Sequence, residues 1–292
     1  MEHARFDFSP IVNRKPLKLS NGARVALWVI PNLEHFHFDQ PSISIYEGTA
    51  GFKPDILNYS WRDYGVRVGI WRLIDMMKKY NIKGTVALNS EVCKEYPEII
   101  EAGKQLGWEW MGHGITNSKL MTNLEREEEH QIIKDVLGTI EKSTGSKPKG
   151  WLGPALTETY NTLDLLEEEG IEYVADWVND DQPYAMKVKN QGLLYSIPYS
   201  IEINDITAFL RFGYTPEQFY QMIVDQFDVL YAEGESNARV MSICLHPFLI
   251  GQPFRSKYLE KAFAYITNHK DVWIATGSEI IDYFKTTEKE AN

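Results

Sequence analysis

The stretch that decides the fold is "RVALWVIPNLE" (residues 24–34). Its first seven residues form a short run of β-branched, aliphatic and aromatic side chains, which predicts a strand. Two polar residues, Asn32 and Glu34, follow directly after the run. A buried strand that ends in polar side chains is the pattern expected where a sheet carries a functional site.

Six further β-rich runs alternate with long amphipathic helical patterns, which predicts parallel strands joined by helices. The runs lie at 84–88, 108–112, 148–152, 172–175, 193–197 and 239–245. About seven such units in 292 residues predict an α/β fold, an irregular TIM-like β/α barrel with about seven parallel strands. No repeat or linker interrupts the chain, so residues 1–292 are expected to form a single catalytic domain.

Three helix starts carry capping-box patterns, in which a threonine is followed three residues later by glutamate or glutamine. The pairs are Thr122 with Glu125, Thr215 with Gln218, and Thr276 with Glu279. A proline after Thr215 strengthens the second pattern, because proline is favoured in the first helical turn. We therefore expect a helix to begin just after each threonine.

The balance of charges argues against two classes of partner. Thirty basic and 41 acidic residues give a net charge of −11, which would repel nucleic acid and anionic membrane surfaces. The first 30 residues do not resemble a secretion signal, and no apolar run reaches membrane-spanning length, so a cytoplasmic protein is expected. Only Cys93 and Cys244 are present, too few for a disulfide framework.

Polar and turn-forming residues recur at the ends of the predicted strands. They are Asn32, Glu34, Asn89, His113, Gly153, Pro154, Asp176 and His246. Barrel enzymes build their active sites from the loops at the carboxyl ends of the strands. A single histidine there could merely cap a strand, but recurrence over separate strands favours a site.

Five segments in this order carry a resemblance to a known family. The segments are "VIPNLEHFHFD", "GHGITNS", "GWLGP", "VADWVNDDQPY" and "SICLHPFLIGQPFR". Together they resemble the polysaccharide deacetylase superfamily (NodB-homology fold), and within it the branch of metal-independent allantoinases and related cyclic amide hydrolases. The segments "DYGVRVGIWR" (63–72) and "NDDQPY" (179–184) are the more specific pointers to that branch. The resemblance extends from about residue 24 to 284 and implies a distorted β/α barrel that hydrolyses carbon–nitrogen bonds.

The chain departs from the metal site that the resemblance implies. Ordinary deacetylases bind a divalent metal through an aspartate after the first strand and an H-x-x-x-H pair after the third. Glu34 and Asn117 stand at the positions of the aspartate and the second histidine. An amide is a poor zinc ligand, so we predict no metal cofactor. The alternative is a zinc site completed by His35, His37 or Asp39, with Glu34, His37 and His113 as the candidate set.

The candidate catalytic residues are Glu34, His113 and His246. Glu34 is interpreted as the base toward water, with its pKa raised by apolar neighbours such as Trp28, Phe36 and Trp151. One histidine would polarise the carbonyl and the other would protonate the departing nitrogen, in an order left open. A reactive cyclic imide or ureide is favoured as the small-molecule substrate, because loss of a metal forfeits several kcal/mol of charge stabilisation.

Eight further residues are candidates for substrate binding: Asn32, Tyr64, Arg67, Asn117, Trp151, Asp176, Asp180 and Asp181. For several of them, an ordinary structural role is the alternative to substrate binding. Arg67 could pair with Asp63, Trp151 could belong to the core, and the two adjacent aspartates are also common in turns. The acidic pair could instead orient His113.

Two other functions and one assembly state stay open. The chain could be a metal-dependent N-deacetylase of polysaccharide or peptidoglycan, or a catalytically silent ligand-binding barrel. The resemblance also implies a homo-oligomer, with a tetramer expected, and the aromatic-rich segment 38–61 is a candidate contact or lid.

Overall fold

The computed structural model describes residues 3–39, 45–190 and 192–291. One sheet of nine strands runs through it in the order β6-β7-β5-β4-β3-β2-β1-β8, and β9 pairs with β1. All pairs are parallel except β6 with β7. The strands are β1 (Val25–Leu33), β2 (Thr85–Leu88), β3 (Glu109–Gly112), β4 (Gly150–Trp151), β5 (Tyr173–Val174), β6 (Tyr184–Met186), β7 (Leu194–Ser196), β8 (Arg239–Leu245) and β9 (Val272–Ile274).

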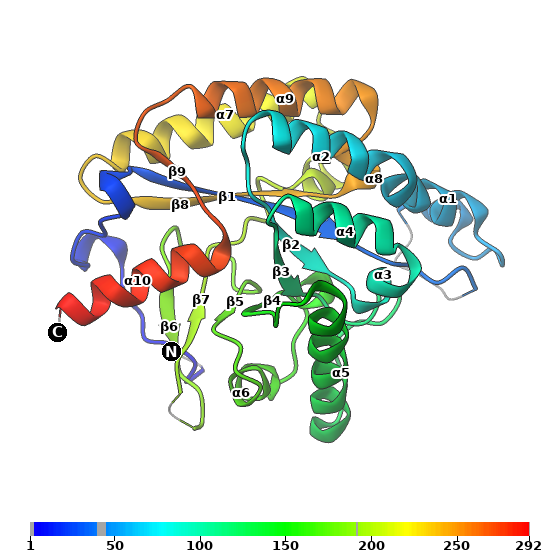
Figure 1. Ribbon diagram of the computed structural model, residues 1–292, viewed down its shortest axis with the longest axis horizontal. Coiled ribbons are helices and arrows are strands. Elements are labelled where there is room, and N and C mark those ends of the chain that lie inside the picture. Colours follow the sequence, from blue (N-terminus) through cyan, green and yellow to red (C-terminus); the bar gives the residue numbers. More distant parts are fainter. Residues whose placement is uncertain (1–2, 40–44, 191, 292) are drawn as a thin grey trace.

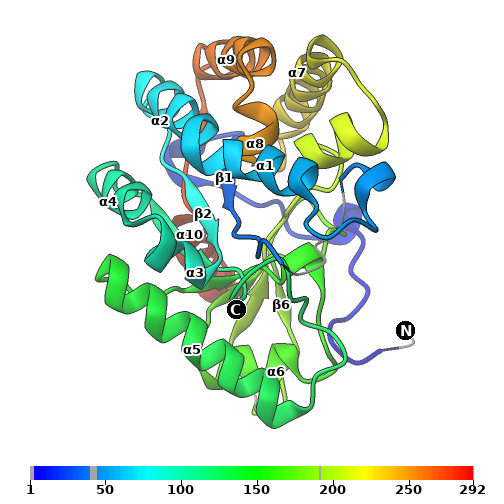
Figure 2. The same cartoon turned by 90° about the vertical axis from the view of Figure 1, so that its right-hand side faces the viewer.

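Helices surround the sheet, as the end-on view in Figure 2 shows for α2, α4, α5, α7 and α9 around β1 and β2. In Figure 1, α7 and α9 lie side by side above β8, and α10 and α6 lie on the opposite side of β1. No helix in the described ranges is both long and apolar enough to span a bilayer. The helices are α1 (Ile56–Tyr64), α2 (Ile70–Lys79), α3 (Ser90–Glu95), α4 (Pro97–Gln105), α5 (Arg126–Thr144), α6 (Thr162–Glu168), α7 (Pro216–Glu233), α8 (Pro247–Ile250), α9 (Pro253–Thr267) and α10 (Gly277–Ala291).

Strand β1 is the centre of the fold, and all nine of its residues are buried. Val25, Leu27 and Val29 belong to the core between the sheet and the outer helices. Ala26 and Trp28 point to the opposite face and join a second core inside the curled sheet. Because successive side chains of a strand face opposite sides, a strand buried on both faces reads as the continuous apolar run seen in the sequence.

The sheet confirms the predicted α/β barrel and all seven predicted strands, although β4 and β5 are only two residues long. Strands β6 and β9 were not predicted from the sequence. The curl does not close into a complete barrel. In the described residues between β7 and β8, the pairing with β8 is limited to an isolated bridge between Asn204 and Cys244.

Two of the three predicted helix starts are confirmed. Thr215 and Gln218 form both bonds of a capping box at the start of α7. At α10, the Thr276 N–H donates to the Glu279 carboxylate over 2.8 Å, and the Glu279 N–H donates to the Thr276 hydroxyl. The third start is wrong, because α5 begins at Arg126 with Glu125 at its N-cap and without a capping side chain.

The glycines of "DYGVRVGIWR" allow two helical segments to touch. Gly65 and Gly69 lie in the π-helical turn that joins α1 to α2. A Cβ at Gly69 would lie 2.0 Å from the Pro247 carbonyl oxygen, and one at Gly65 would lie 2.7 Å from the Phe248 nitrogen. Both contacted residues belong to α8, which directly follows His246. The close approach therefore helps to fix the position of that histidine.

Candidate active site

Three of the predicted residues meet where β1, β3 and β8 end. Glu34, His113 and His246 each follow one of these strands by a single residue. The Nε2 atoms of both histidines lie 3.6 Å from the same Glu34 oxygen, Oε1. The side chains of Glu34, His113 and His246 are only 8%, 3% and 5% exposed, respectively. The sequence thus correctly placed a carboxylate between two imidazoles in a buried site.

Asn117 holds the carboxylate in this position. Its Nδ2 donates to Glu34 Oε1 over 2.6 Å. The amide is oriented by Asn89, whose Nδ2 donates to Asn117 Oδ1 over 2.9 Å and also to the His113 carbonyl oxygen. Asn89 Oδ1 in turn accepts from the His35 N–H over 2.9 Å. With its oxygen engaged by Asn89, Asn117 presents a hydrogen-bond donor, not a metal ligand, to the site.

His246 is paired with Asp205, a fully buried acid that the sequence reading missed. Asp205 Oδ1 lies 2.7 Å from His246 Nδ1, and Oδ2 accepts from the His246 N–H over 2.8 Å. Burial opposes a charge on the ring, but the negative charges of Asp205 and Glu34 outweigh burial and raise the pKa of His246 to about 10. At neutral pH the ring is an imidazolium with its Nε2–H directed toward Glu34.

His113 is held in a different way. Its Nδ1 lies 2.7 Å from the Leu152 carbonyl oxygen, which can only accept, so Nδ1 carries a proton. Among the described residues, the buried Nε2 has no hydrogen-bond partner. In the neutral ring this Nε2 offers a lone pair. The backbone of the segment after β4 therefore fixes the tautomer of His113, and the acidic pair Asp180 and Asp181 does not.

The electrostatics of Glu34 correct one expectation. Burial alone would raise its pKa, as the sequence predicted from apolar neighbours. The positive charge of His246 and the interactions with both histidines outweigh burial and hold the pKa of Glu34 well below its usual value. Glu34 is consequently ionised at any working pH. The predicted rise in its pKa was wrong, because the distance between the carboxylate and the two rings cannot be inferred from residue types.

Arg62 is a second residue that the sequence reading missed. It is buried in α1, with its guanidinium 3.7 Å from the centre of the Phe36 ring. Burial lowers the pKa of Arg62 to about 10, against the opposing attraction of Glu34 and Asp55. The site therefore contains a buried cation near its carboxylate. A charged residue one position before the quoted "DYGVRVGIWR" segment was the only available signal.

The two candidates within that segment lie elsewhere. The side chain of Arg67 is 73% exposed and forms a 3.6 Å ion pair with Asp63. This pair is the structural alternative to substrate binding that the sequence also allowed. The Tyr64 hydroxyl accepts from Arg72, which also donates to the Gly251 carbonyl over 2.7 Å. These bonds join the α1–α2 segment to the end of α8. Tyr64 therefore helps to join two helical segments, and Arg67 forms an ion pair at the surface.

Trp151 and Asn32 are also engaged with the protein itself. Trp151 is fully buried in the outer core, which confirms the alternative reading and overturns its assignment as a substrate wall. The Asn32 amide donates to the Ile30 and Leu245 carbonyls at 3.3 Å, and its oxygen accepts from Tyr199 at 3.4 Å. Asn32 therefore ties β1 to β8 next to the candidate site.

The three predicted aspartates fall into two groups. Asp176 accepts from the Gly153 N–H over 2.7 Å, and burial, followed by nearby Glu158, raises its pKa well above the usual value. Asp180 forms an ion pair with Arg14. Asp180 and Asp181 line a cavity of about 580 Å³ beside β8, together with residues 8–11. The idea that this pair orients His113 is therefore wrong.

The alternative zinc set Glu34, His37 and His113 does not form. His37 Nε2 bonds to Glu91 at 2.6 Å, and Asp39 is exposed. In the part of the chain that the structure describes, one group of three histidine, cysteine or acidic residues brings its ligand atoms within 4.8 Å of one another, and it consists of His35, His37 and Glu91. The ligand atoms of Glu34, His113 and His246 are not all within 4.8 Å of one another.

Comparison with known proteins agrees with the fold and shows the family of the chain. A model of the polysaccharide deacetylase family matches residues 59–174. A putative polysaccharide deacetylase of Schizosaccharomyces pombe is 32% identical over 238 residues, covering 75% of this chain and 73% of that protein. A peptidoglycan deacetylase of Helicobacter pylori is 27% identical over 252 residues, covering 74% of this chain and 84% of that protein.

The crystal structure of PuuE allantoinase is similar over almost the entire chain. Its TM-score is 0.86 at 26% identity, and the match covers 97% of this chain and 99% of that one. This similarity is consistent with the allantoinase-like branch suggested by the sequence motifs. The chain belongs to the polysaccharide deacetylase family and is a hydrolase of carbon–nitrogen bonds.

Proposed function

We propose that the chain opens a small cyclic ureide or imide by hydrolysing a ring carbon–nitrogen bond, without a metal at Glu34. The observation that carries this proposal is the Asn117 amide, which donates to Glu34 where a metal-dependent deacetylase would place a second histidine ligand. The similarity to PuuE allantoinase supports the same class of substrate.

The donor set around Glu34 does not fit the family's metal. Asn117 Nδ2 has no lone pair for a cation, and its oxygen already accepts from Asn89. Zinc in catalytic sites takes three protein ligands from imidazole, carboxylate or thiolate groups. Here each histidine Nε2 lies 3.6 Å from Glu34 Oε1, but the three ligand atoms are not all within 4.8 Å of one another. We derive no step of the reaction through a metal.

The side chains present can supply the steps of amide hydrolysis. Glu34 orients a water molecule and takes its proton as the oxygen attacks the ring carbonyl. His246 donates a hydrogen bond to the developing oxyanion and then a proton to the departing nitrogen, so that the ring C–N bond breaks and a carboxylic acid and a free N–H form. The carboxylic acid then returns a proton to His246 and leaves as the carboxylate, and Glu34 releases the proton of water to solvent. His113 Nε2 accepts from the water or from a ring N–H.

The low pKa of Glu34 makes it a weak base in the resting site, because the imidazolium of His246 stabilises its charge. That stabilisation declines as His246 transfers its proton. The two groups interact strongly, so their protonation states change together during the reaction. A reactive ring carbonyl suits such a site better than an unactivated acetamide, because no Lewis acid polarises the carbonyl.

Turnover is expected to be insensitive to chelation. The protein would be dialysed against a chelator, and hydrolysis would be followed on hydantoin-type and imide rings and, in parallel, on N-acetylated sugar oligomers. Ring opening should continue at the same rate, and the acetylated oligomers should not be hydrolysed. Loss of activity on chelation, restored by about one zinc ion per chain, would favour the metal-dependent N-deacetylase instead.

We further propose that the chain assembles as a homotetramer in the cytoplasm, as its resemblance to allantoinases implies. Residues 40–44 of the candidate contact segment 38–61 lie outside the described residues. In the remainder of the segment, large apolar side chains including Tyr46, Phe52 and Ile56 are exposed, which suits an interface. Light scattering at micromolar concentration should give a mass near four times 33.7 kDa. A monomer would contradict the proposed assembly.

A further inference from the structure

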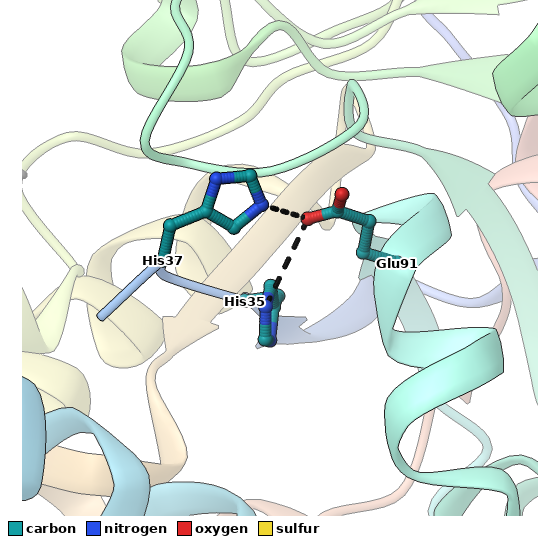
Figure 3. A group of neighbouring side chains, drawn as sticks. All are labelled: His35, His37 and Glu91. Carbon is teal, nitrogen blue, oxygen red and sulfur yellow. Dashed lines mark hydrogen bonds and ion pairs between the residues drawn. The ribbon is translucent and has the colours of Figure 1, made fainter. Parts of the chain in front are cut away.

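The side chains of two histidines just beyond Glu34 lie near the same acid, Glu91 of helix α3. Figure 3 shows His35 and His37 pointing toward Glu91, which lies in the first turn of α3. Glu91 Oε2 lies 2.6 Å from His37 Nε2 and 3.8 Å from His35 Nε2. The three ligand atoms lie within 4.8 Å of one another. We propose that these three residues form a binding site for a divalent transition-metal ion of the zinc class, separate from the catalytic residues.

The donor types and spacing suit such an ion. Zinc binds imidazole nitrogen at 2.0–2.1 Å and carboxylate oxygen at 2.0–2.2 Å, so tetrahedral ligand atoms lie about 3.3 Å apart. The two distances from Glu91 lie on either side of that value. Side-chain movements of less than about 1 Å would place all three around one ion. Two imidazoles and one carboxylate leave a position for water or a further ligand.

The backbone already holds the ligands in place. The His35 carbonyl accepts from the Asn117 N–H over 3.0 Å and from the Thr116 hydroxyl over 2.7 Å. The His37 N–H donates to the Ser118 hydroxyl over 2.9 Å. These bonds attach the histidine segment to residues 116–118, so little conformational entropy would be lost on binding.

Glu91 is attached to the same loop from the other side. The Ser90 and Glu91 N–H groups donate to the Gly114 and Ile115 carbonyls over 3.0 and 3.2 Å. Residues 114–118 therefore position all three ligands.

The outer environment also fits a metal site. Tyr96 places its hydroxyl 3.4 Å from His35 Nδ1, the nitrogen that does not face Glu91. A partner on the second ring nitrogen orients a metal-binding histidine. The three ligands are partly exposed, so an ion can enter from solvent. An ion here would crosslink the segment after Glu34 to α3 and would stabilise the loop that carries Asn117.

The test is metal titration of the full chain after chelation, with zinc and with cobalt, whose visible spectrum reports coordination by nitrogen and oxygen. We expect about one ion per chain and a higher melting temperature with the ion bound. Glu91→Gln and His37→Ala should each weaken binding by about 100-fold or more, because loss of even an outer partner costs 10–100-fold. Glu98→Gln removes an exposed acid from the neighbouring helix α4 and should leave binding unchanged.

Glu34→Gln distinguishes this site from the catalytic one. Binding that persists in Glu34→Gln and disappears in Glu91→Gln supports the proposed site, whatever the substrate of the enzyme. Binding that survives Glu91→Gln, or no binding at micromolar zinc, would overturn it. An ion lost in Glu34→Gln but kept in Glu91→Gln would overturn it as well, and would also contradict the metal-free reaction. Circular dichroism of each variant, compared with wild type, separates loss of the ligand from loss of the fold.

Discussion

Glu34→Gln is expected to lower kcat by about 100-fold or more while KM changes little. Glutamine keeps the shape of the side chain and can still accept a hydrogen bond from Asn117. It removes the carboxylate that lies 3.6 Å from both imidazoles, and with it the group that orients water and takes its proton. The measurement is steady-state hydrolysis of whichever ring substrate the wild type opens.

Two variants serve as controls for this result. Glu95→Gln, on the exposed side of α3, removes the same charge outside the site and should leave kcat unchanged. Asn117→His recreates the H-x-x-x-H spacing with His113 and should be far milder than loss of Glu34. Near-normal turnover of Glu34→Gln would transfer the role of base to His113, whose buried Nε2 lacks a partner among the described residues.

The clustering of Glu34, His113 and His246 could be predicted from the sequence because the ends of the strands can be recognised in it. The three runs before Glu34, His113 and His246 are short and mostly apolar, so the polar residues just beyond each run mark the carboxyl edge of the sheet. In a parallel sheet these edges gather at one end. Apolar patterning therefore placed three residues together that lie 79 and 133 positions apart along the chain.

The supporting residues were not predictable in the same way. Asp205 begins the helical turn after β7, and its distance to His246 depends on how the chain before it crosses the open side of the sheet. Arg62 reaches the site from a helix, where sequence periodicity gives a face but not a depth. The sign of the Glu34 pKa shift depends on distances between charges, to which residue type alone gives no access.

Three of the substrate-binding candidates have other roles in the structure, for a related reason. Trp151, Asn32 and Arg67 are residue types that often bind ligands, but the same types also fill cores, join strands and form surface ion pairs. Whether such a residue can contact a ligand depends on the direction in which its side chain points. For Trp151, one residue of register decides between the inner and outer faces of β4, and it points outward into the core.

Asp205→Asn is expected to move the alkaline limb of the pH–rate profile to lower pH and to reduce kcat by about 100-fold or more. The wild-type ring of His246 has its pKa raised to about 10, with Asp205 the largest cause that raises it. Below that value the ring holds the proton that the reaction needs, so activity should fall only as pH rises through about 10. Asparagine removes the negative charge, and the proton is then lost at lower pH.

The same pKa shift predicts how stability depends on pH. His246 binds its proton more tightly in the folded chain than in the unfolded one, whose ordinary value is 6.5. Its contribution to the free energy of unfolding is therefore complete below about pH 6.5 and is lost as pH rises through about 10. Thermal melts between these limits should show a smaller decline for Asp205→Asn than for wild type.

Glu202→Gln, which removes an exposed charge three residues away, should leave both profiles unchanged. An unshifted alkaline limb in Asp205→Asn would show that His246 does not carry the catalytic proton, and the acid would then have to be sought at His113.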